Sequence, residues 1–263
     1  PYFSYFSHPL SGTVATDVPF NVSTTDFWGN PIDNRRGNHT ISLYVNGPSP
    51  DDCYFVGYGN SIPNLPLDPN GNQSVTVRLT TKIGPNCVRM DAFGSIPDRL
   101  KWINADTTGI PFSISQAFTP SGSPPSLPAD GMSKFTIIYT LLDCYGNPTK
   151  GQWVRINTTV AGEVYDLKSN TQGQIEATYG PRPSIGVINI TATALGNISV
   201  TCWQEVEFVN TAATNMELTA NPETMASHDV NPLITADITA SVMDIMGNPV
   251  ENELVTFSLG TVR

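Results

Sequence analysis

Apolar and polar residues alternate in three separate stretches of the chain, and each stretch ends at the same turn sequence. In the third stretch, the apolar face consists of Ile234, Ala236, Ile238, Ala240 and Val242. The same spacing, counted back from the turn, selects Leu141, Tyr139, Ile137 and Phe135 in the second stretch, and Thr24, Val22, Phe20 and Val18 in the first. A period of two residues is typical of a β-strand with one face on a core. Each stretch therefore predicts such a strand.

The turn that follows each stretch reads Asp-x-x-Gly-Asn-Pro, and its copies begin 117 and 101 residues apart. This spacing is that of whole domains rather than of solenoid repeats. The aspartate can hydrogen-bond the backbone just ahead, the glycine accepts a positive φ, and the proline fixes φ beyond it. The turn residues are Asp26, Gly29, Asn30 and Pro31, then Asp143, Gly146, Asn147 and Pro148, then Asp244, Gly247, Asn248 and Pro249. A second strand is expected after each turn, at Ile41–Val45, Trp153–Thr159 and Leu254–Leu259.

A second set of landmarks repeats between the first two copies at a constant offset of 102 residues. Ile83, Gly84 and Gly94 recur as Ile185, Gly186 and Gly196, and Asn70–Gly71 aligns with Gln172–Gly173. The turns themselves are 117 residues apart, so the first copy must contain 15 extra residues. We place this insertion near residues 46–62.

These landmarks together resemble one known domain family. Leu127–Gly131, the strand after it, Asp143–Pro148 and Thr171–Gln174 look like the bacterial Ig-like group 1 (Big_1) domain of invasins and intimins. Ile234–Phe257 resembles the same family. The first copy departs from it by a longer segment after the turn (Ile32–His39) and by the insertion. The resemblance implies an all-β fold of tandem immunoglobulin-like β-sandwiches that hold binding tips away from a bacterial or archaeal cell surface.

The expected domains are residues 1–118 with the insertion, a Pro/Ser/Gly linker at 119–124, a second domain at 125–210 and an incomplete third domain at 211–263. Half a sandwich leaves an apolar face and open edges in water. Three explanations stay open: the sequence is a fragment of a longer chain, the half domain packs on its neighbour, or a strand from another chain completes it. The aromatic start, Pro1–Phe6, could be such a donated strand or the first strand of its own domain. The absence of a start methionine and signal peptide suggests a mature product or a cut fragment.

Composition narrows the function classes. A net charge of −10 argues against binding to nucleic acid and against docking on anionic membranes. The longest apolar segment, Ile137–Leu142, is too short for a membrane helix, so no direct membrane insertion is expected. The sequence therefore points to an extracellular protein, at the cell surface or secreted.

The four cysteines, Cys53, Cys87, Cys144 and Cys202, form no Cys-x-x-Cys motif, which disfavours zinc and thioredoxin-like sites. Of the three arithmetical pairings, the domain boundaries favour Cys53 with Cys87 and Cys144 with Cys202, and disulfides would imply an oxidising compartment. Sequons for N-glycosylation occur at Asn21, Asn38, Asn72, Asn157, Asn189 and Asn197. The chain is rich in Asn, Ser and Thr, so chance alone gives a similar number of sequons. The sequons therefore permit glycosylation without indicating it.

No catalytic motif is recognisable, and the histidines His8, His39 and His228 are scattered, so we expect no enzyme. Calcium is the one cofactor considered. Asp68, Asn70 and Asn72 carry oxygen atoms at alternate positions, as calcium loops do, but a distal glutamate is missing and a plain hairpin turn is favoured. The candidate binding tip combines Trp28 of the first turn with Tyr54, Phe55 and Tyr58 of the insertion, against a reading in which these side chains pack locally.

The sequence predicts a non-catalytic extracellular structural component, such as part of a surface layer, sheath or stalk. Its expected partners are other copies of itself or other surface proteins, together with glycans. One alternative is an adhesin that binds a glycan or protein through its first domain. Another is a set of accessory domains of a secreted enzyme.

Overall fold

The computed structural model of the chain describes residues 3–32, 39–49, 52–92, 99–226, 229–231, 233–258 and 260. Within these ranges the chain forms strands, turns and loops but no helix, so the predicted all-β class is confirmed. Accordingly, no helix of the described residues is long and apolar enough to cross a membrane.

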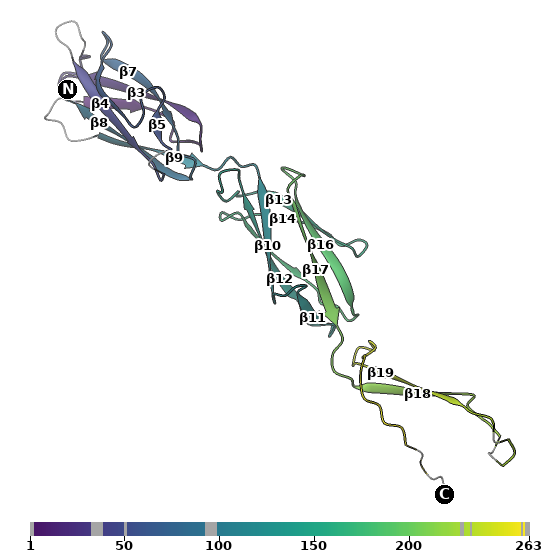
Figure 1. Cartoon of the computed structure of the whole chain (residues 1–263). Helices are drawn as coiled ribbons and strands as arrows, with labels where there is room; N and C mark the ends of the chain where they lie inside the picture. The colour runs from purple at the N-terminus through teal and green to yellow at the C-terminus, as the bar shows by residue number, and fades with distance from the viewer. Residues whose placement is uncertain are drawn as a thin grey trace. The chain divides into compact units, whose positions relative to one another are not determined.

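The strands associate into five sheets (Figure 1). In chain order they are β1 (Phe3–Ser7), β2 (Ser11–Thr13), β3 (Asp17–Thr25), β4 (Thr40–Asn46), β5 (Tyr54–Phe55), β6 (Ser61–Pro66), β7 (Asn72–Arg78), β8 (Gly84–Ala92), β9 (Arg99–Asp106), β10 (Ser113–Thr119), β11 (Ser126–Pro128), β12 (Phe135–Leu142), β13 (Trp153–Thr158), β14 (Val164–Lys168), β15 (Gln174–Tyr179), β16 (Gly186–Ala194), β17 (Thr201–Val209), β18 (Asn215–Asn221) and β19 (Asp237–Met243).

The first sandwich packs a four-stranded sheet, ordered β1-β3-β7-β5, against a five-stranded sheet, ordered β2-β9-β8-β4-β6. The residues of β3 that the alternation assigned to a core, Val18, Phe20, Val22 and Thr24, are all buried, as predicted. Strand β1 pairs antiparallel along β3, with Phe3 opposite Thr25. Phe3–Phe6 of the aromatic start therefore belong to the first strand of their own sandwich.

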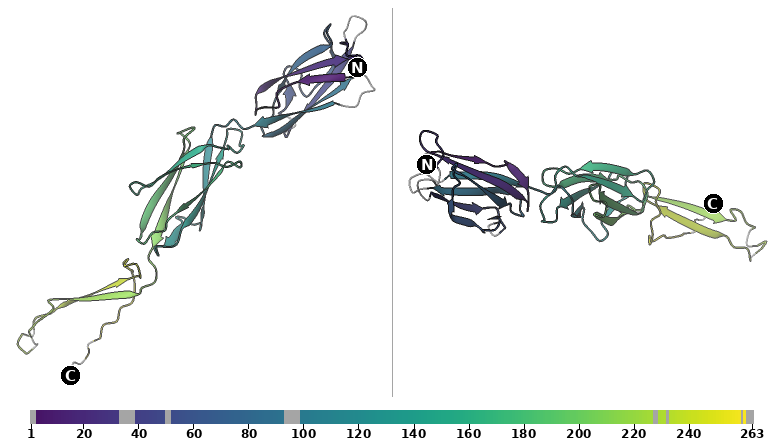
Figure 2. Two further views of the ribbon diagram at one scale, coloured as in Figure 1. Left: turned by 180° about the vertical axis from the view of Figure 1, so that it is seen from behind. Right: turned by 90° about the horizontal axis from the view of Figure 1, so that it is seen from above.

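The second sandwich consists of a three-stranded sheet, ordered β10-β12-β15, and a five-stranded sheet, ordered β11-β17-β16-β13-β14; Figure 2 shows both layers from two further sides. Phe135, Ile137, Tyr139 and Leu141 of β12 are buried, as the alternation predicts. The Phe135 ring meets that of Phe208 from the facing sheet edge-on, with 5.5 Å between ring centroids. Such aromatic pairs add to the stability that burial of apolar area provides.

The two sandwiches share one topology. The order β2-β9-β8-β4-β6 corresponds position by position to β11-β17-β16-β13-β14, and β1-β3-β7 corresponds to β10-β12-β15. Only β5 has no counterpart. It belongs to residues 47–60, between β4 and β6, whereas residues 159–163 alone separate β13 from β14. The repetition that the turns indicated therefore extends through the whole sandwich.

In the third copy, β18 and β19 form a two-stranded antiparallel sheet. The predicted strand at Leu254–Leu259 is wrong for its described part, because residues 254–258 belong to no strand. The equivalent strand of the second sandwich, β13, is held between β14 and β16, and the described part of the third copy supplies no such neighbours. Strands without partners on which to bury a face are marginal in water.

The apolar side chains of β18 and β19 stay exposed, Met216, Leu218 and Ile238 among them. All three explanations for the half domain therefore stay open.

Contacts divide the chain into two compact units. The first comprises Pro1–Ser113, Leu141–Gln152 and Ser169–Gly173, and the second comprises Ile114–Thr140, Trp153–Lys168 and Gln174–Arg263. The turn at Asp143–Pro148 thus belongs, by its contacts, to the first unit. The boundary predicted at 119–124 differs from this division and stays a prediction.

Gly173 shows why the repeated landmarks include this glycine. Its φ is +69°, and a Cβ there would lie 2.6 Å from the carbonyl oxygen of Leu141 and 2.9 Å from the nitrogen of Thr149. Gly71, its counterpart in the first sandwich, has a φ of +73° and would place a Cβ 2.8 Å from the carbonyl oxygen of Thr24. Both glycines let a connection between the two sheets approach the backbone at the ends of the Asp-x-x-Gly-Asn-Pro turn.

Substitution Gly173→Ala should therefore lower the free energy of unfolding more than Gly162→Ala does. Both glycines have a positive φ, but nothing lies within 4 Å of a Cβ at Gly162. The positive φ costs an alanine about 1 kcal/mol at either position, and the backbone clash at Gly173 should add about 1–3 kcal/mol. Urea unfolding measures both variants, and equal destabilisation would contradict the packing described for Gly173.

Candidate functional site

The three Asp-x-x-Gly-Asn-Pro turns have the same internal hydrogen bonds. In chain order, the aspartate N–H lies 2.8, 2.8 and 2.9 Å from the asparagine carbonyl oxygen. Oδ1 of each aspartate accepts the asparagine backbone N–H at 2.9 Å, and the asparagine side-chain Nδ2 donates back to the carboxylate. The glycine φ values are +83°, +77° and +82°. Each turn is therefore formed by its own residues.

Asn147 of the second turn also binds the loop that leads into β8. Its Nδ2 donates to the carbonyl oxygen of Thr81 at 2.8 Å, and its Oδ1 accepts the N–H of Ile83 at 3.2 Å. Lys82 adds a bond from Nζ to the carbonyl oxygen of Tyr145 at 2.7 Å. All these residues lie in the first unit, where Asn147 is buried.

Asn248 of the third turn makes the same pair of bonds with the loop that leads into β16. Its Nδ2 donates to the carbonyl oxygen of Pro183 at 2.9 Å, and its Oδ1 accepts the N–H of Ile185 at 3.3 Å, all within the second unit. We call residues 81–84 and 183–186 the Ile-Gly loops. The repeated Ile-Gly landmark thus marks the segment that receives the turn asparagine.

The second carboxylate oxygen of the turn aspartate holds the chain that enters the same repeat. Oδ2 of Asp143 accepts the hydroxyl of Thr107 at 3.0 Å and the N–H of Thr108 at 3.2 Å. Oδ2 of Asp244 accepts the N–H of Thr211 at 3.1 Å. These threonines precede β10 and β18, so one carboxylate fixes the turn and the incoming segment together.

Hydrogen bonding keeps these aspartates ionised. Burial raises the pKa of Asp143, but donors on Asn147, Thr108 and Tyr145 together outweigh it, and the pKa lies below its ordinary value. At Asp244 burial acts in the same direction, and donors that include Thr211 and Asn248 bring the pKa to about 2. A carboxylate that accepts several N–H bonds favours its charged form.

The first turn differs from the other two in its surroundings alone. Asn30 is exposed, and among the described hydrogen bonds its side chain donates only to the carboxylate of Asp26. This side-chain bond is also the largest influence that lowers the pKa of Asp26.

The structure does not bring the residues of the candidate binding tip together. Trp28 lies beyond the Thr25 end of β3, whereas Tyr54 pairs with Arg78, which lies opposite Asp17 at the other end of β3. Tyr54 and Tyr58 are exposed, but Phe55 is fully buried in the core of the first sandwich, so its assignment to a tip is wrong.

The calcium candidates form a plain turn. Oδ1 of Asp68 accepts the backbone N–H of Asn70 at 2.8 Å and of Asn72 at 2.7 Å, and Oδ1 of Asn72 accepts the hydroxyl of Ser23 at 2.6 Å. These oxygens hold the turn that leads from β6 in one sheet to β7 in the other. In the described ranges, no group of three or more His, Cys, Asp or Glu side chains could hold a metal ion.

The predicted disulfides are not formed, since all four cysteines are free thiols. Cys144 is exposed in the second turn, whereas Cys202 lies on β17, with its Sγ 3.3 Å from Oε1 of Gln116. Gln116 belongs to β10 of the facing sheet. The thiol of Cys202 therefore points toward β10 and not toward the turn that contains Cys144.

Cys53 and Cys87 are neighbours without a bond. Burial and then the nearby Cys87 raise the pKa of Cys53 to about 11, and burial also raises the pKa of Cys87. Burial likewise raises the pKa of Cys202 to about 11. Three of the four sulfurs are therefore held as neutral thiols, which attack electrophiles slowly.

The glycosylation candidates differ in exposure. Asn21 on β3 is exposed, Asn72, Asn157, Asn189 and Asn197 are half-buried, and Asn38 lies outside the described residues. Glycosylation at any of them stays a prediction.

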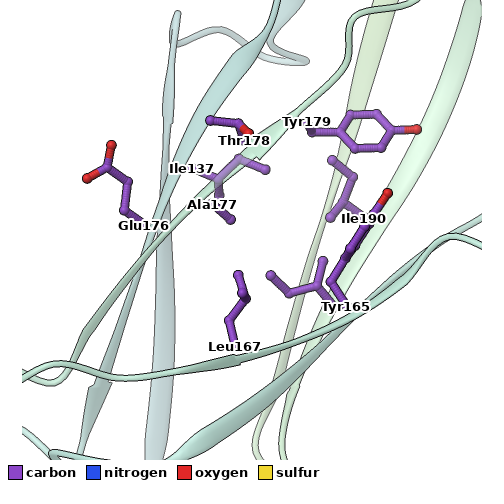
Figure 3. A pocket seen from close by; sticks show the side chains of 9 residues that line it. Ile137, Tyr165, Leu167, Glu176, Ala177, Thr178, Tyr179 and Ile190 are labelled. Carbon is purple, nitrogen blue, oxygen red and sulfur yellow. The ribbon is translucent and has the colours of Figure 1, made fainter.

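A cavity of about 300 Å³ opens in the second sandwich between the edge strands β14 and β15 (Figure 3). Ile137, Leu167 and Ile190 give it an apolar lining. The Tyr179 hydroxyl at its margin donates to Glu163 at 3.0 Å and accepts from Arg182 at 2.8 Å. In the first sandwich β5 pairs with β7, the counterpart of β15, and Phe55 fills the core there. The cavity thus marks an edge that the insertion closes in one repeat and leaves open in the other.

Comparisons with known proteins agree with this architecture. Residues 118–211 match the family model described as invasin, domain 3. The chain also aligns with FdeC, described as an Escherichia coli adhesin, at 16% identity over 95% of this chain and 76% of FdeC, with a TM-score of 0.64. InvD of Yersinia pseudotuberculosis aligns at 16% identity over 94% of this chain and 72% of InvD, with a TM-score of 0.56.

A third alignment is with invasin, described as a bacterial integrin-binding protein. It has 18% identity over 96% of this chain and a TM-score of 0.45, and the chain spans only 48% of that longer protein. The family match shows an invasin-type Ig-like domain at residues 118–211, and the alignments with FdeC and InvD show the same fold.

Acid should weaken the bond between Asp143 and the incoming segment. Because the folded pKa of Asp143 is lowered, its contribution is complete above the ordinary aspartate pKa of about 3.9 and is lost as pH falls through the lower folded value. Below about pH 4, urea midpoints of the wild type should therefore fall faster than those of Asp143→Asn, which cannot titrate. Glu205→Gln, at an exposed position, is the control. Parallel pH profiles for the wild type and Asp143→Asn would contradict this role.

Thiol labelling should follow exposure. Iodoacetamide should modify Cys144 in the native protein, and Cys53 only after unfolding, because Cys53 is fully buried. Peptide mass mapping without reductant measures this order. A cross-linked peptide that contains Cys53 and Cys87 would show instead that the disulfide predicted from the sequence does form.

Proposed function

We propose that the chain is a non-catalytic extracellular surface component in which turn asparagines bind the Ile-Gly loops of the preceding repeats. The match of residues 118–211 to an invasin-type Ig-like domain supports a surface role. The observation that carries the proposal is the pair of bonds from Asn147 to Thr81 and Ile83, repeated by Asn248 with Pro183 and Ile185. A joint used twice in the same way suits a stalk, sheath or surface layer. Such a component has other copies of itself or other surface proteins as partners.

Burial makes these bonds effective. Asn147 and Asn248 are 2% and 8% exposed, so water does not compete for their amide groups. A buried hydrogen bond contributes about 1 kcal/mol, and removal of one partner leaves the other unsatisfied at a cost of about 1–3 kcal/mol. The two bonds of one asparagine therefore favour the bound state of the turn and the Ile-Gly loop.

A second candidate function is adhesion. FdeC is described as an adhesin and invasin as integrin-binding, and the exposed aromatic side chain of Trp28 offers the first sandwich a surface for a glycan or protein. Binding of the whole chain to a glycan array or to cells, abolished by Trp28→Ala, would favour this candidate.

The substitution Asn147→Ala tests the joint. In the wild type, the side-chain amide of Asn147 should exchange slowly with solvent, because it donates to the carbonyl oxygen of Thr81. The Ile83 amide should also exchange with solvent faster in Asn147→Ala, because it loses the Asn147 Oδ1 acceptor. Asn30→Ala, which removes a matching but exposed side chain, is the control. Fast exchange of the Ile83 amide already present in the wild type would overturn the proposal.

A further inference from the structure

The first turn has the same internal hydrogen bonds as the other two, but among the described residues it binds no Ile-Gly loop. The aspartate carboxylate and the asparagine amide are bonded alike in all three turns, so Asn30 is held in the same internal arrangement as Asn147 and Asn248. Asn147 and Asn248 use both amide atoms to bind an Ile-Gly loop. Among the described residues, Asn30 contacts no such loop and is exposed.

The third residue of the turn is less exposed in the two turns that bind an Ile-Gly loop than in the first turn. This residue is Tyr145 in the second turn and Met246 in the third, where it is 36% and 43% exposed. In the first turn it is Trp28, which is 81% exposed. The second turn residue shows no such trend, because Cys144 and Ile245 stay exposed beside their occupied joints. The asparagine and the third residue are therefore the positions that a bound loop covers.

The asparagine side chain bonds only to backbone atoms of the Ile-Gly loop. It donates to one carbonyl oxygen and accepts the N–H two residues later, and the residue that provides the carbonyl differs, being Thr81 in one loop and Pro183 in the other. The glycine that ends each Ile-Gly loop has a positive φ, +136° for Gly84 and +149° for Gly186. The requirement is thus a loop shape, which any repeat with the Ile-Gly landmark can present.

We propose that the turn Asp26–Pro31 is an unoccupied joint whose ligand is the Ile-Gly loop of another Ig-like repeat. Asn30 would bind the carbonyl oxygen and N–H of that loop, and Trp28 would be covered by it. This inference rests on the proposed function, since it assigns to the first turn the role that the other two already have.

Strand register shows how to build the test. Asn215 pairs with Met243, the residue before Asp244, and Phe3 pairs with Thr25, the residue before Asp26. Phe3 and Asn215 are therefore equivalent positions. A copy of residues 111–212 fused directly to Pro1 places its Thr211 four residues before Phe3, as Thr211 stands four residues before Asn215. The fusion thus reproduces the spacing of an occupied joint.

Acrylamide quenching of Trp28 is the readout, in a background with Phe at positions Trp102, Trp153 and Trp203 in every copy. We expect the quenching constant of Trp28 to fall about twofold in the fused chain, in proportion to the exposure that Trp28 loses. Asn30→Ala in the fused chain should restore the quenching of the unfused chain. Asn21→Ala, which replaces another exposed asparagine of the first repeat, within β3 and away from the turn, is the matched control and should not.

Two results would overturn the proposal. One is a Trp28 that is quenched equally in the fused and unfused chains. The other is that added glycans lower the acrylamide quenching of Trp28 in the unfused chain, whereas fusion of the extra repeat does not. Hydrogen exchange of the Ile185 amide in the same samples distinguishes failure of this inference from failure of the proposed function. If Ile185 is protected by Asn248 but Trp28 is unaffected, only this inference fails, whereas an unprotected Ile185 also removes the proposed function.

Discussion

The bond between the aspartate carboxylate and the asparagine side chain of each turn is the interaction on which the other features depend. The carboxylate accepts N–H groups of its own turn and, in the second and third copies, donors of the incoming segment as well. It also fixes the asparagine amide, which leaves one donor and one acceptor directed at the next loop. A neutral side chain in place of the aspartate would lose the charge-assisted bonds that hold this arrangement. The aspartate and the asparagine together thus enable the turn to bind a loop of the preceding repeat.

The insertion of the first repeat acts on the sandwich itself. A sandwich has open edges between its two sheets, and apolar core residues near an edge need cover. In the first repeat β5 extends the smaller sheet beside β7 and places Phe55 in the core. In the second repeat the corresponding edge has no extra strand, and the apolar cavity beside Ile137 and Ile190 lies there. The same topology therefore tolerates both a closed and an open edge.

The sequence predicts the repeated part of this fold well because the relevant signals are local. Period-two alternation identifies β3 and β12 with their buried faces, and the residue types of the turn specify its backbone without help from elsewhere. In the third copy the alternation identifies a strand, but β19 begins only at Asp237 and the predicted core face is not buried. The outward bonds of Asn147 reach residues 64 and 66 positions away, and no local pattern reports such a contact. Only the parallel repetition of the Ile-Gly landmark could have indicated it.

The failed predictions have physical reasons of the same kind. Membership of one domain does not aim two cysteine side chains at each other, as Cys144 and Cys202 show. An apolar run such as Leu254–Leu259 forms a strand only where neighbouring strands pair with it. Phe55 belongs to an aromatic cluster in the sequence, but its alternation with Tyr54 places the two on opposite faces of β5, one buried and one exposed.

The most direct test of the central claim is the detection of scalar couplings across the hydrogen bonds of the turn asparagines by NMR. The account predicts a coupling between the side-chain amide of Asn147 and the carbonyl carbon of Thr81, and a second between Asn248 and Pro183. Asn30 should show no such coupling to a loop. Absence of both predicted couplings, with all three side-chain amides exchanging freely with water, would contradict the account.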